Sequence, residues 1–248
     1  MRSPDPKIVI LPGMDGTGLL LENFAAALPV SFRAQIVRYP VDGCGSYAEV
    51  ARFLAAAHLD TEPFIVVAES FSSVASIAWA ATKPSNLCGL VVCVGFATPP
   101  VRRLLRPISA LLTYLLPVLP RPSFVTRHWT AGWDASEDTL GRLRKIRDTV
   151  PAATFAARIR AILACNVRAE LAQVRIPVLL LGAEDDRLVR RERLEEMRRI
   201  QPQAAVEIFP GPHLLLERHA SRAAESVARF ARECIAEMPS HGERATLR

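Results

Sequence analysis

Ser70 is the residue of this sequence best placed to act as a nucleophile. It follows a short apolar run, Phe64–Ala68, and precedes a segment in which apolar residues recur at helical spacing. A serine on a tight turn between a buried strand and a helix presents its hydroxyl oxygen to a ligand. A serine at this position can also cap the helix that follows. A nucleophile needs a base near its hydroxyl group, whereas a helix cap needs a backbone N–H of the helix there.

The residues around Ser70 resemble a nucleophile elbow, whose usual motif is G-x-S-x-G. In this motif the two glycines keep side chains out of a crowded turn. Here Ala68 and Ser72, the next smallest residues, occupy the glycine positions. The substitutions increase the crowding, but they are compatible with the turn.

A serine hydroxyl is a weak nucleophile, so it needs a base within hydrogen-bond reach and a third group that orients the base. Two later loops contain suitable residues. Asp185 and Asp186 follow one short apolar run, and His213 follows the next. Both loops leave the carboxyl ends of expected strands, which is the edge of the sheet at which Ser70 lies. The chain order serine, acid, histidine is the order expected for α/β-hydrolases.

These residues must be positioned by an α/β fold. Apolar runs bounded by turn residues predict buried strands, and apolar residues at helical spacing predict the helices between them. The expected strands are Lys7–Leu11, Ala34–Tyr39, Phe64–Ala68, Leu87–Val94, Val178–Leu181 and Ala205–Phe209. The expected helices are Leu19–Leu28, Ser46–Ala57, Ser70–Ala81, Asp138–Val150, Thr154–Leu163 and His219–Met238. The alternation predicts a mostly parallel sheet of about six strands flanked by helices.

The alternation of strands and helices stops between Ala97 and Leu171, where no strand pattern is present. We therefore expect a core formed by residues 1–96 and 170–238, a helical cap inserted at 97–169, and a polar tail at 239–248. The cap would lie over the carboxyl edge of the sheet, where ligands of open α/β sheets bind. Its apolar residues favour an acyl chain as the ligand; they include Leu104, Leu105, Leu111, Leu112, Leu115 and Leu116.

Over roughly Lys7 to Glu237 the chain resembles the α/β-hydrolase family, and within it the small esterases that carry a cap. The resemblance implies that Ser70 is the nucleophile, that Asp186 is the orienting acid and that His213 is the base. Asp185 is a second, poorer candidate for the acid. The family usually has two strands before its first core strand, and only six residues precede Lys7, so these two strands are expected to be absent.

The family's oxyanion loop follows its first core strand, and here it corresponds to Leu11–Gly16. The resemblance implies that the backbone N–H groups of Met14 and Phe71 bind the oxyanion of a tetrahedral intermediate. The run GMDGTG after a strand also resembles a phosphate cradle. However, its spacing is neither G-x-G-x-x-G nor that of a Walker motif, and Asp15 would repel a phosphate group.

Composition indicates a globular protein with a large core, since 50% of the 248 residues are hydrophobic. The five cysteines form no C-x-x-C pair, which favours a reduced, cytoplasmic protein without a zinc site, and Cys88 and Cys93 are expected in the core. No segment is long and apolar enough for a signal peptide or a membrane span. No metal or cofactor is expected.

The net charge of +6 is unevenly distributed. Residues 97–169 contain eleven arginines and Lys145 against four acidic residues, so this segment carries +8 and the remainder carries −2. Such a cap suggests an anionic partner, for example an acyl carrier protein, a coenzyme A thioester or an anionic lipid surface. Nucleic acid is not expected, because no binding motif accompanies the charge.

The sequence therefore predicts a serine hydrolase that cleaves a carboxylic ester or thioester, of the carboxylesterase or thioesterase type. Two alternatives remain open. An acyltransferase would use the same three residues, and a ligand-binding protein could keep the fold without turnover. The altered elbow, with Ala68 and Ser72, is the main argument for the second alternative.

Overall fold

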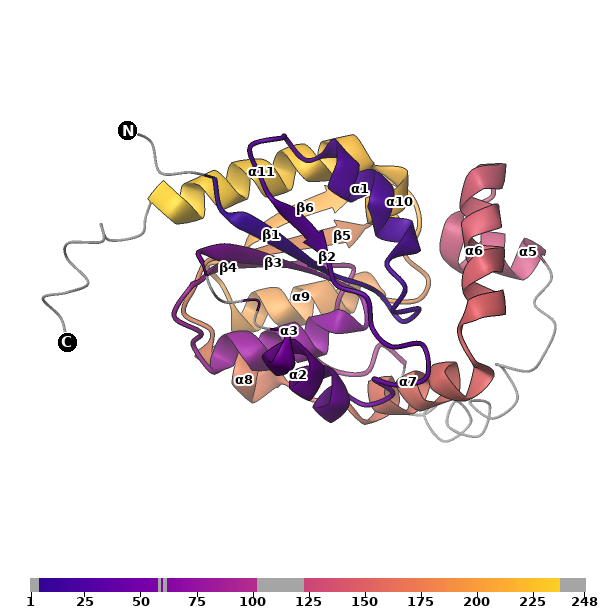
Figure 1. The fold of residues 1–248 in the computed structure, drawn as a ribbon, viewed down its shortest axis with the longest axis horizontal. Coiled ribbons are helices and arrows are strands. Elements are labelled where there is room, and N and C mark those ends of the chain that lie inside the picture. The colour runs from indigo at the N-terminus through magenta and orange to yellow at the C-terminus, as the bar shows by residue number, and fades with distance from the viewer. Residues whose placement is uncertain (1–4, 58, 60–61, 102–122, 237–248) are drawn as a thin grey trace, which may run out of the picture.

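The chain forms one sheet of six parallel strands in the order β2-β1-β3-β4-β5-β6 (Figure 1). The structure is a computed structural model, and it describes residues 5–57, 59, 62–101 and 123–236. The strands are β1 (Lys7–Leu11), β2 (Ala34–Ile36), β3 (Phe64–Glu69), β4 (Leu87–Cys93), β5 (Val178–Ala183) and β6 (Ala205–Phe209). The expected α/β class and six-stranded sheet are confirmed, and each expected strand is present. The predicted bounds of β1 and β6 match those observed.

Strand β2 is shorter than expected, because the chain leaves the sheet after Ile36 rather than at Tyr39. The Tyr39 N–H donates to the Gly16 carbonyl (2.8 Å), so it hydrogen-bonds to the loop after β1 instead of extending the ladder. Pro40, which has no N–H to donate, follows directly. The loops after β1 and β2 are thereby held together above the carboxyl edge of the sheet.

Helices cover both faces of the sheet (Figure 1). One face is covered by α1 (Glu22–Ala27) and α11 (Ala220–Ala236), and the other by α2 (Tyr47–Ala56), α3 (Ser72–Ala81), α8 (Arg168–Gln173) and α9 (Arg191–Ile200). Side chains alternate along each strand between the two apolar layers, so that Val66 packs toward α3 while Ile65 packs toward α11. Cys88 and Cys93 lie buried in β4, as expected, and none of the five cysteines forms a disulfide.

Local sequence explains where these helices begin. Ser46 caps α2 through a capping box, in which its hydroxyl accepts from the Glu49 N–H (3.3 Å) and the Glu49 carboxylate accepts from the Ser46 N–H (2.9 Å).

Helix α9 was not predicted. Its sequence, RERLEEMRRI, has only Leu194 and Met197 as buried apolar residues, too few to show a helical period.

The described residues between 97 and 169 form helices and no strand. They are α5 (Ser123–Thr126), the short π-helix η3 (Arg127–Ala131), α6 (Glu137–Thr149), α7 (Ala152–Ala164) and the first two residues of α8. Helices α5, α6 and α7 lie beyond the carboxyl ends of the strands (Figure 1). The expected boundary at 169/170 falls inside α8, which packs with α3 and α9. The predicted apolar cap residues from Leu104 to Leu116, and the polar tail, lie outside the described residues.

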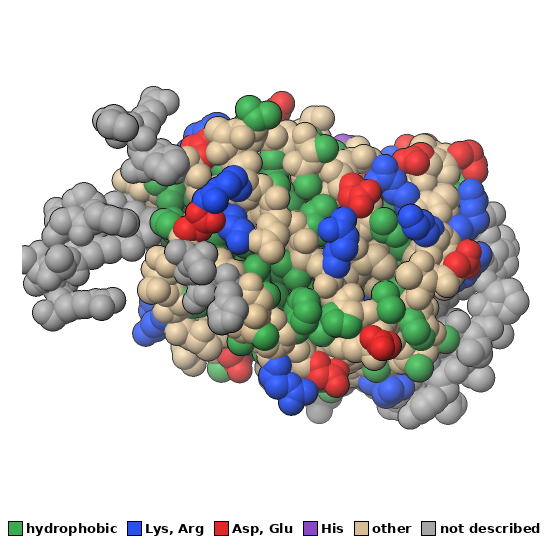
Figure 2. Space-filling view, viewed as in Figure 1, with side chains coloured by type: hydrophobic (Ala, Val, Ile, Leu, Met, Phe, Trp, Pro, Cys, Tyr) green, Lys and Arg blue, Asp and Glu red, His purple; other side chains and the backbone are tan. Residues whose placement is uncertain are grey.

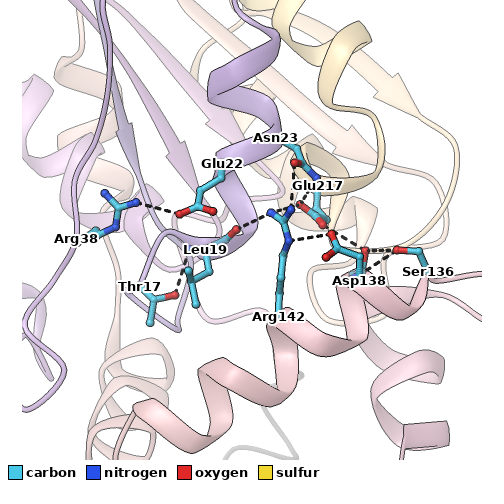
Figure 3. Close-up of polar contacts among 10 residues, drawn as sticks. Thr17, Leu19, Glu22, Asn23, Arg38, Ser136, Asp138, Arg142 and Glu217 are labelled. Carbon is cyan, nitrogen blue, oxygen red and sulfur yellow. Dashed lines mark hydrogen bonds and ion pairs between the residues drawn. The ribbon is translucent and has the colours of Figure 1, made fainter.

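Helix α6 is fixed to the core through Arg142 (Figure 3). Its guanidinium donates to the Leu19 carbonyl (3.1 Å) and to Asn23 Oδ1 (3.2 Å), next to α1, and lies 3.8 Å from a carboxylate oxygen of Glu217. Glu217 belongs to α10 (Leu215–Arg218), the helix that follows the loop of His213. The contact therefore connects α6 to two separate parts of the core.

The described structure gives no support to an anionic carrier at the inserted segment. Each arginine described between 97 and 169 already has an interaction partner within the chain: Arg127, Arg142, Arg144, Arg147, Arg158, Arg160 and Arg168. On the face shown in Figure 2, basic and acidic side chains are interspersed and form no continuous basic surface. Among the helices that the structure describes, none has the length and apolar character of a membrane span.

Candidate active site

Ser70 stands on a sharp turn between β3 and α3. Its φ is +47°, a left-handed conformation that is costly for a residue with a side chain. Its N–H donates to the Cys93 carbonyl (2.9 Å) and its carbonyl accepts from the Ser73 N–H (3.0 Å), so hydrogen bonds hold the strained residue on both sides. No side-chain hydrogen bond caps the start of α3. The Ser70 hydroxyl therefore does not serve as a helix cap.

The two residues that replace the elbow glycines, Ala68 and Ser72, are fully buried. The Ser72 hydroxyl donates to the Pro12 carbonyl and accepts a hydrogen bond from the Tyr39 hydroxyl (2.7 Å). The extra side chain at position 72 is thus hydrogen-bonded rather than merely tolerated. It joins the start of α3 to the loop after β1.

His213 lies between Ser70 and Asp186. Its Nε2 is 3.0 Å from the Ser70 Oγ, and its Nδ1 is 2.7 Å from Asp186 Oδ2. With Nδ1 donating to the carboxylate, Nε2 is left to accept the hydroxyl proton. All three side chains are buried, with exposures of 7–9%. The structure thus brings the three residues expected from the sequence into one hydrogen-bonded row.

The loops of Asp186 and His213 are joined by their backbones. The Glu184 N–H donates to the Phe209 carbonyl and the Asp185 N–H to the Gly211 carbonyl, both at 2.9 Å. The second oxygen of Asp186 accepts from the N–H groups of Leu188 (2.9 Å) and Val189 (2.8 Å). The carboxylate is therefore oriented by its own loop.

Asp185 does not take part in this row, because its side chain is exposed to solvent. Of the two candidate acids, only Asp186 contacts the imidazole of His213.

Burial alone would lower the pKa of His213. The charge of Asp186 and its hydrogen bond, helped by the charge of Glu69, raise that pKa above 6.5 instead.

The oxyanion loop lies beside the elbow because β1 and β3 are neighbours, with Leu11 and Ala68 in register. This pair is also where the strand order reverses, so a crevice is expected between their carboxyl ends. The two residues expected to supply oxyanion donors, Met14 and Phe71, follow these strand ends. Neither N–H donates to a protein acceptor among the described residues. An oxyanion donor must be without a protein acceptor, so this observation is compatible with the expected role.

Glu69, the last residue of β3, is a buried acid that sequence reasoning missed. It is 4% exposed, and its carboxylate accepts a hydrogen bond from the Gly13 N–H. Burial, followed by the charge of Asp15, raises the pKa of Glu69 to about 7, although the charge of His213 and the Gly13 hydrogen bond oppose the shift. The sequence signal that could have identified Glu69 is its place, an acidic residue directly after the apolar run Phe64–Ala68.

A cavity of about 260 Å³ adjoins the site between the ends of β4 and β5. Its lining includes Asp186 and Val189 together with Gly95 and Leu194, but neither Ser70 nor His213. Because the nucleophile does not face it, we do not assign it as the acyl-binding pocket. Among the described residues, no group of three or more His, Cys, Asp or Glu side chains is arranged to hold a metal ion.

Comparison with known proteins agrees with this architecture. The model of the alpha/beta hydrolase family matches residues 8–229. Similar solved structures include an esterase from Exiguobacterium antarcticum (TM-score 0.78, 13% identity, 93% of each chain) and the enol-lactonase from Burkholderia xenovorans LB400 (0.73, 18% identity, 92% of each chain). MenH from S. aureus is also similar (0.76, 12% identity, 94% of this chain and 96% of that one). No curated protein matches the sequence.

Proposed function

Because this chain belongs to the alpha/beta hydrolase family, we propose that it is a serine hydrolase that cleaves a carboxylic ester or thioester through an acyl-enzyme on Ser70. Family membership supports hydrolase activity in general. The observation that carries the more specific proposal is the continuous row Asp186–His213–Ser70, with contacts of 2.7 and 3.0 Å. A serine used only for structure would not require a buried imidazole at its hydroxyl and a buried carboxylate behind that imidazole.

In the proposed reaction, the His213 Nε2 accepts the hydroxyl proton while the Ser70 Oγ bonds to the substrate carbonyl carbon. The resulting tetrahedral intermediate collapses, the alcohol or thiol leaves with the proton from His213, and an acyl ester remains on Ser70. Water then attacks this ester while His213 accepts a proton from it. As the second tetrahedral intermediate collapses, His213 returns that proton to the Ser70 Oγ and the carboxylic acid is released. Asp186 keeps Nδ1 protonated and stabilises the imidazolium that forms in each step.

The N–H groups of Met14 and Phe71 bind the oxyanion in both tetrahedral intermediates. Each such donor is worth roughly 10²–10³ in rate, because it acts where negative charge develops. Both donors belong to the proposed core, residues 1–96 and 170–238. The inserted segment, 97–169, would then shape the acyl site without supplying a reacting group.

The test uses p-nitrophenyl esters of graded acyl length and a fluorophosphonate probe. We expect turnover and covalent labelling of the wild-type protein, and loss of both in Ser70→Ala. Ser76→Ala is a matched control, because Ser76 is a buried serine in the helix that follows Ser70, and its hydroxyl donates to the Ser73 carbonyl (2.9 Å). A folded wild-type protein that the probe does not label would contradict the proposal.

Transfer of the acyl group to an alcohol instead of water would use the same groups. Product analysis in the presence of an added alcohol separates the two reactions, because a transferase forms the new ester in preference to the free acid. A ligand-binding protein without turnover is the less favoured alternative. The hydrogen-bonded Ser72 removes its main argument, which was that the altered elbow is degraded.

A further inference from the structure

We propose that Arg158 is a positioning residue that holds the oxyanion loop, Leu11–Gly16, in the geometry needed to stabilise the tetrahedral intermediate. The inference rests on the proposed function and extends it to a residue that does not touch the substrate. Arg158 lies on α7, far from the loop in sequence, and belongs to the inserted segment.

The guanidinium of Arg158 donates to backbone carbonyls of two loops. Nη1 donates to the Met14 carbonyl (2.9 Å) and to the Asp15 carbonyl (2.8 Å), both in the oxyanion loop. Nε donates to the Cys44 carbonyl (3.1 Å) and Nη2 to the Gly43 carbonyl (3.0 Å), in the loop after β2. One side chain thus fastens together the loops that follow β1 and β2.

The guanidinium is completely buried, with 0% exposure. Among the described residues it forms no ion pair with a carboxylate. Its charge is stabilised by the carbonyl dipoles, by the rings of Tyr39 and Phe71 and by the charge of Asp15. Burying a cation in this way costs stability unless its hydrogen bonds are satisfied. The hydrogen bonds to four carbonyls offset this cost, and they also fix the positions of those carbonyls relative to one another.

Gly16 shows how closely the loop follows the guanidinium. Its φ is +73°, and a Cβ at this position would lie 2.6 Å from Nη1 of Arg158. The central carbon of the guanidinium also lies 6.0 Å from the ring centre of Phe71, the residue expected to supply the second oxyanion donor. Arg158 therefore contacts both parts of the chain that carry the two proposed donors.

Every carbonyl from Pro12 to Gly16 has a donor, and Arg158 supplies two of the five. The others are the Ser72 hydroxyl on Pro12, the Gly16 N–H on Gly13 (3.1 Å) and the Tyr39 N–H on Gly16 (2.8 Å). The Gly13 N–H is in turn held by Glu69. The peptide units on both sides of the Met14 N–H are fixed, while that N–H has no protein acceptor among the described residues. Removing Arg158 releases the two carbonyls that follow the Met14 N–H in the chain.

The expected kinetic effect is specific. A misplaced oxyanion donor weakens binding of the transition state more than binding of the substrate, so kcat falls while KM changes little. A defect in general packing would instead lower the amount of folded protein and leave kcat per folded molecule unchanged. The division of the effect between kcat and KM therefore separates positioning from stability.

The experiment compares Arg158→Met and Arg158→Lys with wild type, using p-nitrophenyl butyrate and active-site titration with the fluorophosphonate probe. We expect Arg158→Met to lower kcat by roughly 10²-fold, which is the effect of losing one oxyanion donor, with KM changed less than about threefold. A lysine side chain has fewer donors than arginine and no planar fork but keeps the charge, so we expect a smaller loss of kcat in Arg158→Lys. If Arg158→Met does not fold, the kcat of Arg158→Lys relative to wild type tests the inference instead.

Arg142→Met is the matched control, because Arg142 also joins the inserted segment to the core through a backbone carbonyl but contacts no residue of the oxyanion loop. It should lose stability and keep kcat. The inference is overturned if Arg158→Lys keeps the wild-type kcat, or if both arginine-to-methionine variants lower kcat equally while Ser70→Ala remains inactive. If turnover does not depend on Ser70, the proposed function fails, and this inference fails with it.

Discussion

Replacing Glu69 by glutamine should change how the stability of the protein depends on pH. Glutamine keeps the size of the side chain and a carbonyl oxygen that can accept from the Gly13 N–H, but it cannot ionise. In the wild-type protein, burial and the neighbouring charge of Asp15 raise the pKa of Glu69 from 4.5 to about 7. The folded state therefore retains a proton that the unfolded chain releases between these two pH values.

The sign and size of the effect follow from this difference in bound protons. Where the folded state binds more protons, stability falls as pH rises, here from about pH 4.5 to about pH 7. The difference of about 2.5 between the two pKa values corresponds to about 3 kcal/mol in total, most of it lost between pH 5 and pH 8. At pH 5, Glu69→Gln should be about as stable as wild type, because glutamine resembles the protonated acid.

The assay is urea unfolding at pH 5 and at pH 8 for wild type, Glu69→Gln and Glu192→Gln. Glu192 is an exposed acid on α9, so its variant should follow wild type at both pH values. We expect the loss of unfolding free energy between pH 5 and pH 8 to be about 2–3 kcal/mol greater in wild type than in Glu69→Gln. Equal losses in the two proteins would refute the assignment of this pH dependence to Glu69.

The same variant should also shift the pH profile of activity. The charge of Glu69 contributes to the raised pKa of His213, after the contributions of Asp186. Without that charge the imidazole loses its proton more easily, so the acidic limb of kcat/KM should move to lower pH in Glu69→Gln. An unchanged or upward-shifted limb would show that the two side chains do not interact as described.

Three further predictions concern the site itself. Asp186→Asn should lower kcat by roughly 10³–10⁴-fold, because the imidazole of His213 loses the partner that fixes its tautomer. Asp185→Asn should retain the wild-type kcat. Equal losses of kcat in the two variants would contradict the assignment of Asp186 as the acid. Ser72→Ala should lower the free energy of unfolding by about 1–3 kcal/mol, because it removes the donor to the buried Pro12 carbonyl. Urea titration measures this change. An unchanged free energy of unfolding would show that the hydrogen bond contributes nothing to stability. In wild type, kcat/KM should fall with decreasing pH at a pKa above the ordinary histidine value of 6.5, since protonated His213 cannot act as a base. A limb at or below 6.5 would contradict the raised pKa.

Much of the fold could be predicted from the sequence, because fully buried parallel strands leave a simple signal. The runs that became β1 and β6 were predicted with their observed bounds, since apolar residues end there at the same point as the ladder. The end of β2 could not be predicted, because it depends on a hydrogen bond between Tyr39 and Gly16, which lies on another loop. Helix α9 was missed because charged residues dominate its sequence.

The row of Ser70, Asp186 and His213 could be anticipated because parallel strands bring the loops at their carboxyl ends to one edge. Their contact distances required the structure. Arg158 could not be anticipated at all, since nothing in its neighbourhood distinguishes it from the other arginines between 97 and 169. Its partners are carbonyls more than 110 residues away, and a backbone carbonyl has no sequence signature.

The three-residue length of β2 has a consequence for how copies of this protein meet one another. This strand forms one edge of the sheet, and its outer N–H and C=O groups could pair with a strand of another molecule. So short an edge strand offers few backbone groups for pairing with a strand of another molecule. The exposed and charged Arg33 and Arg38, on either side of β2, further disfavour such pairing. Lengthening this strand by apolar residues would therefore be expected to promote aggregation.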